Sequence, residues 1–221
     1  PPWSGFRAIV ASYRDHRAAW SVEVTGNLYS SAPVPVASAV GGALTAASFA
    51  SGDRLYRYGL YAVVSFGNAL QGWVLETTAS RARRNRFAII LMLSLGILGG
   101  LGLAYLGAPV SAILFGESVA AFQSTLIWLG VAYAAVATST PLIRNVLIPA
   151  RRERLVLAVT VVSAVLGIAT MGVFGTMWGA EGVAMGLATS ELSTLIACAV
   201  LTARVGLHPV PQAGGTHTDE Q

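Results

Sequence analysis

The amino-acid sequence predicts an all-helical membrane protein with six transmembrane helices, and three observations support this fold class. Charged residues make up 11% of the 221 residues, whereas a soluble domain carries about 25%. The apolar residues, 54% of the chain, gather into long runs. Arginines collect between alternate runs. Because a bilayer core of about 30 Å needs about 20 apolar residues as a helix, each long run has the length of one span.

The chain divides into a membrane bundle and two flanking segments. We expect a cytoplasmic or interfacial segment over 1–27, a transmembrane bundle over 28–202, and a disordered cytoplasmic tail over 203–221. Within the bundle, the expected spans are 28–50, 56–75, 87–107, 122–143, 155–174 and 182–202. The first span is the least hydrophobic, and the short loop Gly175–Glu181 is expected to form an outer hairpin between the last two spans.

The distribution of arginines predicts the orientation of the spans. All 14 basic residues are arginine. All but Arg54 and Arg57 lie before the first span, between the second and third, between the fourth and fifth, or after the sixth. With an even number of spans these segments share one side. Because basic loops stay in the cytoplasm, we expect both ends of the chain on the cytoplasmic side of the cell membrane.

A polar stripe marks the second expected span. Its members are three or four residues apart, so they share one face of a helix: Arg54, Arg57, Tyr61, Ser65, Asn68 and Gln71. In one interpretation the arginines reach the headgroups and the amides bond neighbouring helices. In the other, the stripe binds an anionic substrate in a central cavity, since the guanidinium fork holds phosphate oxygens in pairs. Asp53, next to Arg54, is expected to neutralise that arginine in part.

Glu191 is the second polar residue that stands out. It falls near the middle of the last expected span, where an ionised carboxylate is costly. Such a group either couples transport to an ion gradient or is held structurally by a Ser or Thr on a neighbouring helix. Both readings stay open on the sequence.

Other motifs indicate packing and exclude several classes of protein. Three Gly-x-x-x-Gly motifs begin at Gly96, Gly175 and Gly182 and predict close approach of helix backbones. The one cysteine, Cys198, lies in an apolar run, which excludes a disulfide scaffold and a zinc finger. No nucleophile motif, nucleotide loop or metal motif is found. We therefore expect no catalytic residues, no cofactor, no metal and no nucleic-acid partner.

Several stretches resemble the polysaccharide (O-antigen, Wzx-type) flippases of the multidrug/oligosaccharidyl-lipid/polysaccharide (MOP) exporter superfamily. The resemblance begins with Gly-Asn-Leu-Tyr-Ser-Ser-Ala-Pro-Val-Pro and extends over most of the chain. The stretches that carry it are 26–35, 48–58, 67–74, 114–117 and 178–184. The Pro-Val-Pro segment departs from the family pattern, because it makes the first span less hydrophobic than usual.

The resemblance implies a fold, an activity and a site. Family members have two six-helix halves, and this chain is similar to the C-terminal half, to which its lack of an initial methionine also points. The family moves undecaprenyl-diphosphate-linked oligosaccharides across the membrane by alternating access. Related lipid II flippases carry arginines on cavity-facing helices, including the helix that corresponds to the one bearing Arg54 and Arg57. The implied partners are the lipid-linked glycan, the bilayer and an N-terminal six-helix half.

Three alternatives remain at this point. One is a cation-coupled exporter of small molecules from the same superfamily, for which more intramembrane acidic residues are expected. Another is a membrane scaffold without a transport path, in which the polar stripe would be buried against another helix. The third is a membrane glycosyltransferase, for which Glu117 is the single weak candidate for a catalytic acid.

Overall fold

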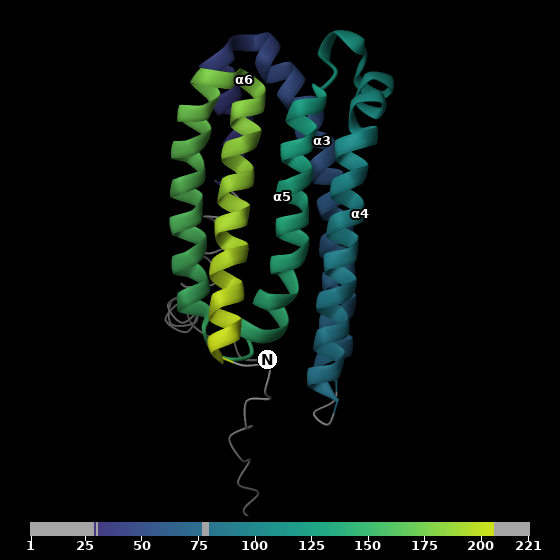
Figure 1. Ribbon diagram of the computed structural model, residues 1–221, viewed down its shortest axis with the longest axis vertical. Helices are drawn as coiled ribbons and strands as arrows, with labels where there is room; N and C mark the ends of the chain where they lie inside the picture. The colour runs from purple at the N-terminus through teal and green to yellow at the C-terminus, as the bar shows by residue number, and fades with distance from the viewer. Residues whose placement is uncertain (1–28, 30, 77–79, 206–221) are drawn as a thin grey trace, which may run out of the picture.

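The structure is a computed structural model that describes residue 29, residues 31–76 and residues 80–205. The expected segment 1–27 lies outside this described part, as does the expected tail from residue 206 onward. All the secondary structure described is helical. The elements are α3 (Pro33–Leu75), α4 (Arg81–Phe115), η1 (Glu117–Val119), α5 (Gln123–Pro141), η2 (Leu142–Leu147) and α6 (Glu153–Val205). Figure 1 shows the long helices standing side by side.

α3 changes direction at Gly42. This glycine has φ 72° and ψ −170°, a backbone conformation that only glycine adopts without strain. Figure 1 shows the bend at the top of the bundle, where α3 passes over the other helices before it descends. The sequence predicts separate spans at 28–50 and 56–75, so that prediction is wrong about the break: the helix is continuous through 51–55 and breaks at Gly42 instead.

Residues 51–55 stay helical because they are packed. Ser51, Gly52 and Asp53 are buried. The Ser51 hydroxyl donates to the backbone oxygen of Val119 at 2.7 Å, and the Ser48 hydroxyl donates to that of Ala120 at 3.0 Å. These bonds join α3 to the last residue of η1 and to the residue that follows it.

α4 and α5 pack closely against each other. α4 extends beyond the expected span 87–107 at both ends, and α5 begins next to the expected residue 122. At the end of α5, Pro141 lacks a backbone donor, and the helix continues as a π-helix, η2. A Cβ added at Gly100 would lie 2.6 Å from the backbone oxygen of Gly130, so the two backbones touch here.

α6 is a hairpin of two antiparallel legs, 153–178 and 180–205. The reversal is at Gly179, with φ 57° and ψ −130°, inside the expected loop Gly175–Glu181. Figure 1 shows the two legs side by side. They touch through glycine: a Cβ at Gly186 would lie 2.3 Å from the backbone nitrogen of Met171. The predicted hairpin and the close contact predicted for the motif that begins at Gly182 are thus both found.

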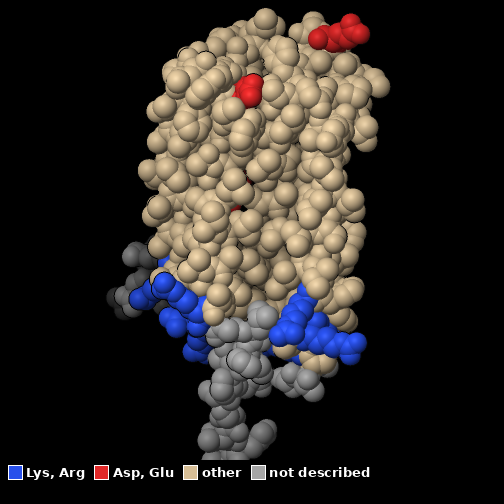
Figure 2. Space-filling view, in the orientation of Figure 1, with Lys and Arg blue, Asp and Glu red and all other residues tan. Residues whose placement is uncertain are grey.

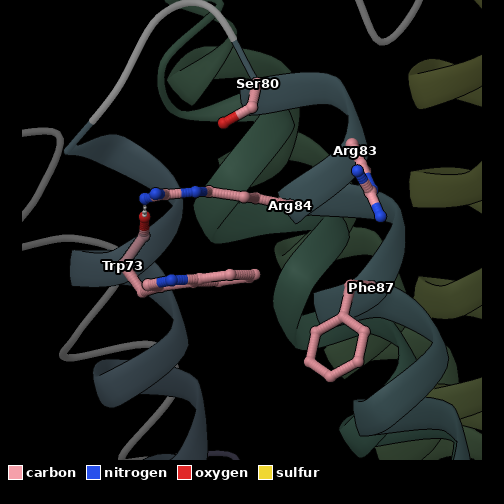
Figure 3. A pocket seen from close by; sticks show the side chains of 5 residues that line it. All are labelled: Trp73, Ser80, Arg83, Arg84 and Phe87. Atoms are coloured by element: carbon pink, nitrogen blue, oxygen red, sulfur yellow. Dashed lines mark hydrogen bonds between the residues drawn. The ribbon is translucent and has the colours of Figure 1, made fainter.

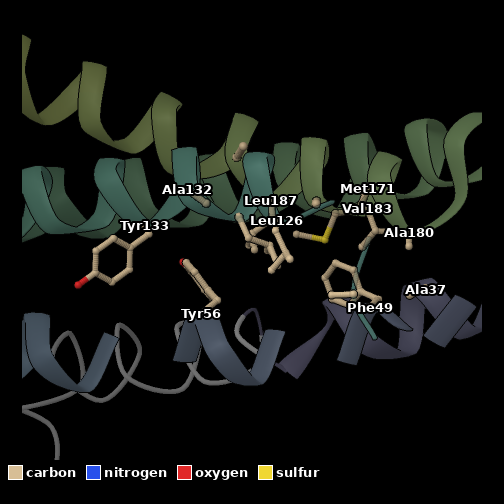
Figure 4. Close-up of a cluster of buried hydrophobic side chains, with 14 of the residues drawn as sticks. Ala37, Phe49, Tyr56, Leu126, Ala132, Tyr133, Met171, Ala180, Val183 and Leu187 are labelled. Atoms are coloured by element: carbon tan, nitrogen blue, oxygen red, sulfur yellow. The ribbon is translucent and has the colours of Figure 1, made fainter. Parts of the chain in front are cut away.

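The core lies where α3, α5 and α6 meet. Leu129 is among its fully buried side chains, as are Phe49, Leu126 and Met171. Figure 4 shows these last three between α3 and the helices opposite. The outer face is also apolar: Ile113 is 82% exposed and Leu98 is 70% exposed. Soluble proteins rarely expose a continuous apolar surface of this kind to water. Among the described residues, four helices are long and apolar enough to span a membrane, so the fold fits a membrane protein.

Candidate functional site

The polar stripe lies on an exposed face of α3. Arg54 and Asn68 are exposed, and Tyr61 is 67% exposed. The opposite face of the helix is buried, because Tyr56, Val63 and Gly67 pack toward the other helices. Ser65 is also exposed, whereas Gln71 is half-buried. The stripe is therefore not part of the core of this bundle, and it is not sealed between two of the described helices.

Arg57 forms an ion pair with Asp53 one turn earlier on α3. The Nε atom of Arg57 donates to the Oδ2 atom of Asp53 at 2.5 Å, and Asp53 is 4% exposed. The sequence predicts that Asp53 neutralises its neighbour Arg54, and this prediction is wrong. Adjacent helical residues point about 100° apart, whereas residues four apart share a face, so the carboxylate reaches Arg57.

Arg54 is held differently from Arg57. Its guanidinium carbon lies 5.7 Å from the centre of the Phe115 ring, at the end of α4. This is the distance of a cation–π contact. Such a contact orients the guanidinium without using its N–H donors. Of the two arginines on the stripe, Arg54 is thus the one whose donors stay open to a ligand in the described part of the chain.

A third arginine reaches the stripe from another helix. Arg144, in η2, donates to the side-chain oxygen of Asn68, and its guanidinium also lies near Gly67. On the sequence, Arg144 counts as one of the basic residues after the fourth span. No local pattern in the sequence places Arg144 beside Asn68, because the two residues are 76 apart in the chain.

Glu191 lies apart from the stripe, in the second leg of α6. It is half-buried. The hydroxyls beside it donate to the first leg of the hairpin: Ser190 to the backbone oxygen of Ser163 at 2.7 Å, and Ser193 to its hydroxyl at 2.8 Å. Neither of these two hydroxyls donates to the Glu191 carboxylate among the described residues.

Tyr56 lies between the two groups of polar residues. It is 5% exposed, and Figure 4 shows its hydroxyl pointing from α3 toward the helices opposite. It interacts electrostatically with Glu191 and also with Asp53 and Arg57. The structure thus brings together Arg54, Arg57 and Tyr61 on one face of α3, and it separates them from Glu191 by the buried side of the same helix.

Charge is concentrated at the ends of the bundle. Figure 2 shows arginines gathered at one end, with a largely uncharged surface above them. The arginines of this end begin α4, link η2 to α6 and end α6: Arg81, Arg83, Arg84, Arg86, Arg151, Arg152, Arg154 and Arg204. Arg54 and Arg57 do not belong to this group, since they lie within α3.

The fold and these features define the class: this is an all-helical protein, compatible with a membrane, in which one helix has an exposed polar face. Comparisons with protein families, with curated proteins and with solved structures return no match for this chain. Within the described residues, no three His, Cys, Asp or Glu side chains come together as metal ligands.

Proposed function

We propose that this protein is the C-terminal, six-helix half of a flippase that moves undecaprenyl-diphosphate-linked oligosaccharide across the cell membrane. The observation that carries the proposal is the exposed polar stripe on α3. Arg54 on this face has no carboxylate partner among the described residues, and an arginine in contact with acyl chains carries a cost that rises to about 2.5–3.5 kcal/mol at the bilayer centre. A second helical half that encloses an aqueous cavity removes this cost.

In the proposed mechanism the stripe binds the diphosphate. Arg54 and Arg57 hold the phosphate oxygens, and Tyr61, Asn68 and Gln71 face the hydrated part of the substrate. The lipid chain stays in the bilayer. Moving a glycan through hydrocarbon would require the loss of its hydrogen bonds to water, whereas a wet cavity keeps them. Rocking of the two halves then exposes the headgroup to the outer side.

If each leg of α6 crosses the bilayer, α6 supplies two spans, and α4, α5 and the long leg of α3 after Gly42 supply one each. The leg of α3 before the bend, Pro33–Gly42, is about 15 Å of helix and is too short to cross by itself, so the sixth span of the proposal would need residues before Pro33, most of them outside the described part. The arginine-rich end of Figure 2 would then face the cytoplasm. Gly42 and Gly179 would both lie at the outer surface, where a glycine reversal is exposed to water.

Depletion of the protein in its native cells tests the function directly. We expect surface polysaccharide to disappear and the lipid-linked glycan to accumulate in the inner leaflet. The leaflet is determined by treating intact cells with a glycosidase that does not cross the membrane. Normal surface polysaccharide after depletion would reject the proposal.

Cysteine labelling tests whether the stripe lines a water-filled cavity. The chain has one native cysteine, Cys198, which is buried and gives a low background. We expect a charged, membrane-impermeant maleimide to label Tyr61→Cys and Ser65→Cys in intact cells. Leu98→Cys is the matched control, because Leu98 is equally exposed but lies on the apolar face of α4. No labelling of either stripe cysteine would support the scaffold alternative.

Glu191 is proposed as the group that couples transport to a cation gradient. We expect an imposed gradient to accelerate transport by the native protein in proteoliposomes and to have no effect on the Glu191→Gln protein, which cannot exchange a cation or a proton at this position. Glu181→Gln is the control, since Glu181 lies beside the turn of α6. An equal response of the Glu191→Gln and native proteins would reject the coupling role.

A further inference from the structure

A pocket of about 390 Å³ lies at the arginine-rich end of the bundle, between the end of α3 and the start of α4. It is lined by Trp73, Ser80, Arg83, Arg84 and Phe87, and Figure 3 shows these side chains around one opening. We call it the arginine pocket. It is separate from the polar stripe residues assigned to the substrate. Its volume falls within the range of about 300–1,000 Å³ of small-molecule sites.

Arg84 is held in place by Trp73. Its guanidinium carbon lies 4.8 Å from the centre of the indole ring, and its Nη1 atom donates to the backbone oxygen of Trp73 at 2.6 Å. Trp73 in turn packs edge-to-face against Phe87, with ring centres 5.7 Å apart. These contacts fix the positive charge of Arg84 over the indole ring of Trp73. The Nη1 atom of the guanidinium is already used in the hydrogen bond to the Trp73 backbone.

Arg83 provides a second positive charge. It is exposed, and within residues 29, 31–76 and 80–205 it has no ion pair with a carboxylate. The acidic residue near the pocket is Glu76, whose carboxylate lies 3.7 Å from Arg84 and is largely exposed. One solvated carboxylate does not balance two arginines, so the pocket keeps a positive charge and favours an anion.

The pocket also lies at a boundary between charged and apolar surface. On α4 the arginines end at Arg86, and the next outward-facing side chains, Phe87 and Ile90, are exposed and apolar. In a membrane this boundary corresponds to the headgroup level, where tryptophan is enriched. A ligand in the pocket would have its charge at the arginines and its apolar part along α4.

We propose that the arginine pocket binds the phosphate of an anionic diacyl phospholipid of the same leaflet. The phosphate oxygens accept hydrogen bonds from Arg83 and Arg84, the Ser80 hydroxyl faces the glycerol part, and the acyl chains lie against Phe87 and Ile90. Basic pockets between helices at the membrane surface bind anionic headgroups in this way. The proposal requires that the chain is in a membrane, but it does not depend on what the protein transports.

Native mass spectrometry of the purified full chain tests the proposal. The chain is equilibrated with equal amounts of phosphatidylglycerol and phosphatidylcholine that carry the same acyl chains. We expect one phosphatidylglycerol to be retained in preference. Arg83→Gln should weaken this preference about fivefold, which corresponds to about 1 kcal/mol for one arginine at a membrane surface. Arg83 is chosen because its removal breaks no ion pair among the described residues.

The control is Arg86→Gln, which removes the same charge three residues further along α4 from a position that does not line the pocket. We expect it to retain the native preference. Equal loss in both variants, or no preference in the native chain, would overturn the proposal. Complete displacement of the lipid by millimolar glycerol phosphate would show that the site takes a soluble phosphate, and would overturn the lipid assignment. Circular dichroism of each variant verifies the helix content.

Discussion

Cells that carry Arg54→Ala are expected to lose most of their surface polysaccharide while the level of the protein stays unchanged. Arg54 is exposed, and its described contact is the ring of Phe115, so its removal does not disturb the core. A hydrogen bond to a charged group contributes about 1.5–3 kcal/mol, so we expect substrate affinity to fall about tenfold or more. Surface glycan is measured on intact cells, and the protein is quantified in the membrane fraction.

The conservative variants separate a binding role from a structural one. Arg54→Lys keeps the charge but not the fork of donors, so we expect partial activity. Arg86→Ala, which removes an exposed arginine of α4 outside the stripe, should leave the surface glycan normal. If Arg54→Ala cells make normal glycan, Arg54 has no part in the transport.

Arg57 requires a different variant, because its positive charge neutralises the buried carboxylate of Asp53. Arg57→Ala leaves Asp53, 4% exposed, without its cation. Breaking a buried ion pair in this way lowers the free energy of unfolding by about 3–5 kcal/mol. Because Arg57 is partly exposed, we expect a smaller loss here. We therefore expect less protein in the membrane for Arg57→Ala. The double variant Asp53→Asn with Arg57→Gln removes both charges, and it reports on substrate binding at a normal protein level.

The sequence predicted the features of the fold that depend on local spacing. The helical class follows from composition, and the turn of α6 follows from the short loop between two apolar runs. The shared face of the polar residues on α3 follows from their spacing of three and four residues. The close approach at Gly96 and Gly100 follows from glycine spacing: a Cβ at Gly96 would lie 3.1 Å from the backbone oxygen of Ala134.

The features that the sequence did not predict depend on tertiary contacts. The Gly41–Gly42 pair lies in an apolar run, and nothing local distinguishes a bend there from a packed glycine. Residues 51–55 look like a loop because they include Gly52 and Asp53, but they are packed against η1, where the Ser51 hydroxyl donates to the backbone oxygen of Val119. The pairing of Arg144 with Asn68 joins residues 76 apart in the chain, a separation beyond any local pattern.

The contact between α4 and α5 provides the second prediction, which concerns stability. Gly130→Ala would place a Cβ atom 2.5 Å from the backbone oxygen of Gly100. A backbone oxygen cannot rotate away as a side chain can, so the two helices must move apart. Overpacking of this kind costs about 1–3 kcal/mol. We expect the melting temperature in detergent, followed by tryptophan fluorescence, to fall for Gly130→Ala relative to the native protein.

Gly102→Ala is the matched control, because Gly102 also lies in α4 and a Cβ there has no other atom within 4 Å. It should stabilise the helix by up to about 1 kcal/mol, the difference in helix propensity between alanine and glycine. Gly100→Ala strains the same contact from the opposite side, so combining it with Gly130→Ala should lower the melting temperature by less than the sum of the single effects. Additive effects would mean that the two glycines do not face each other, and an unchanged melting temperature for Gly130→Ala would exclude their backbone contact.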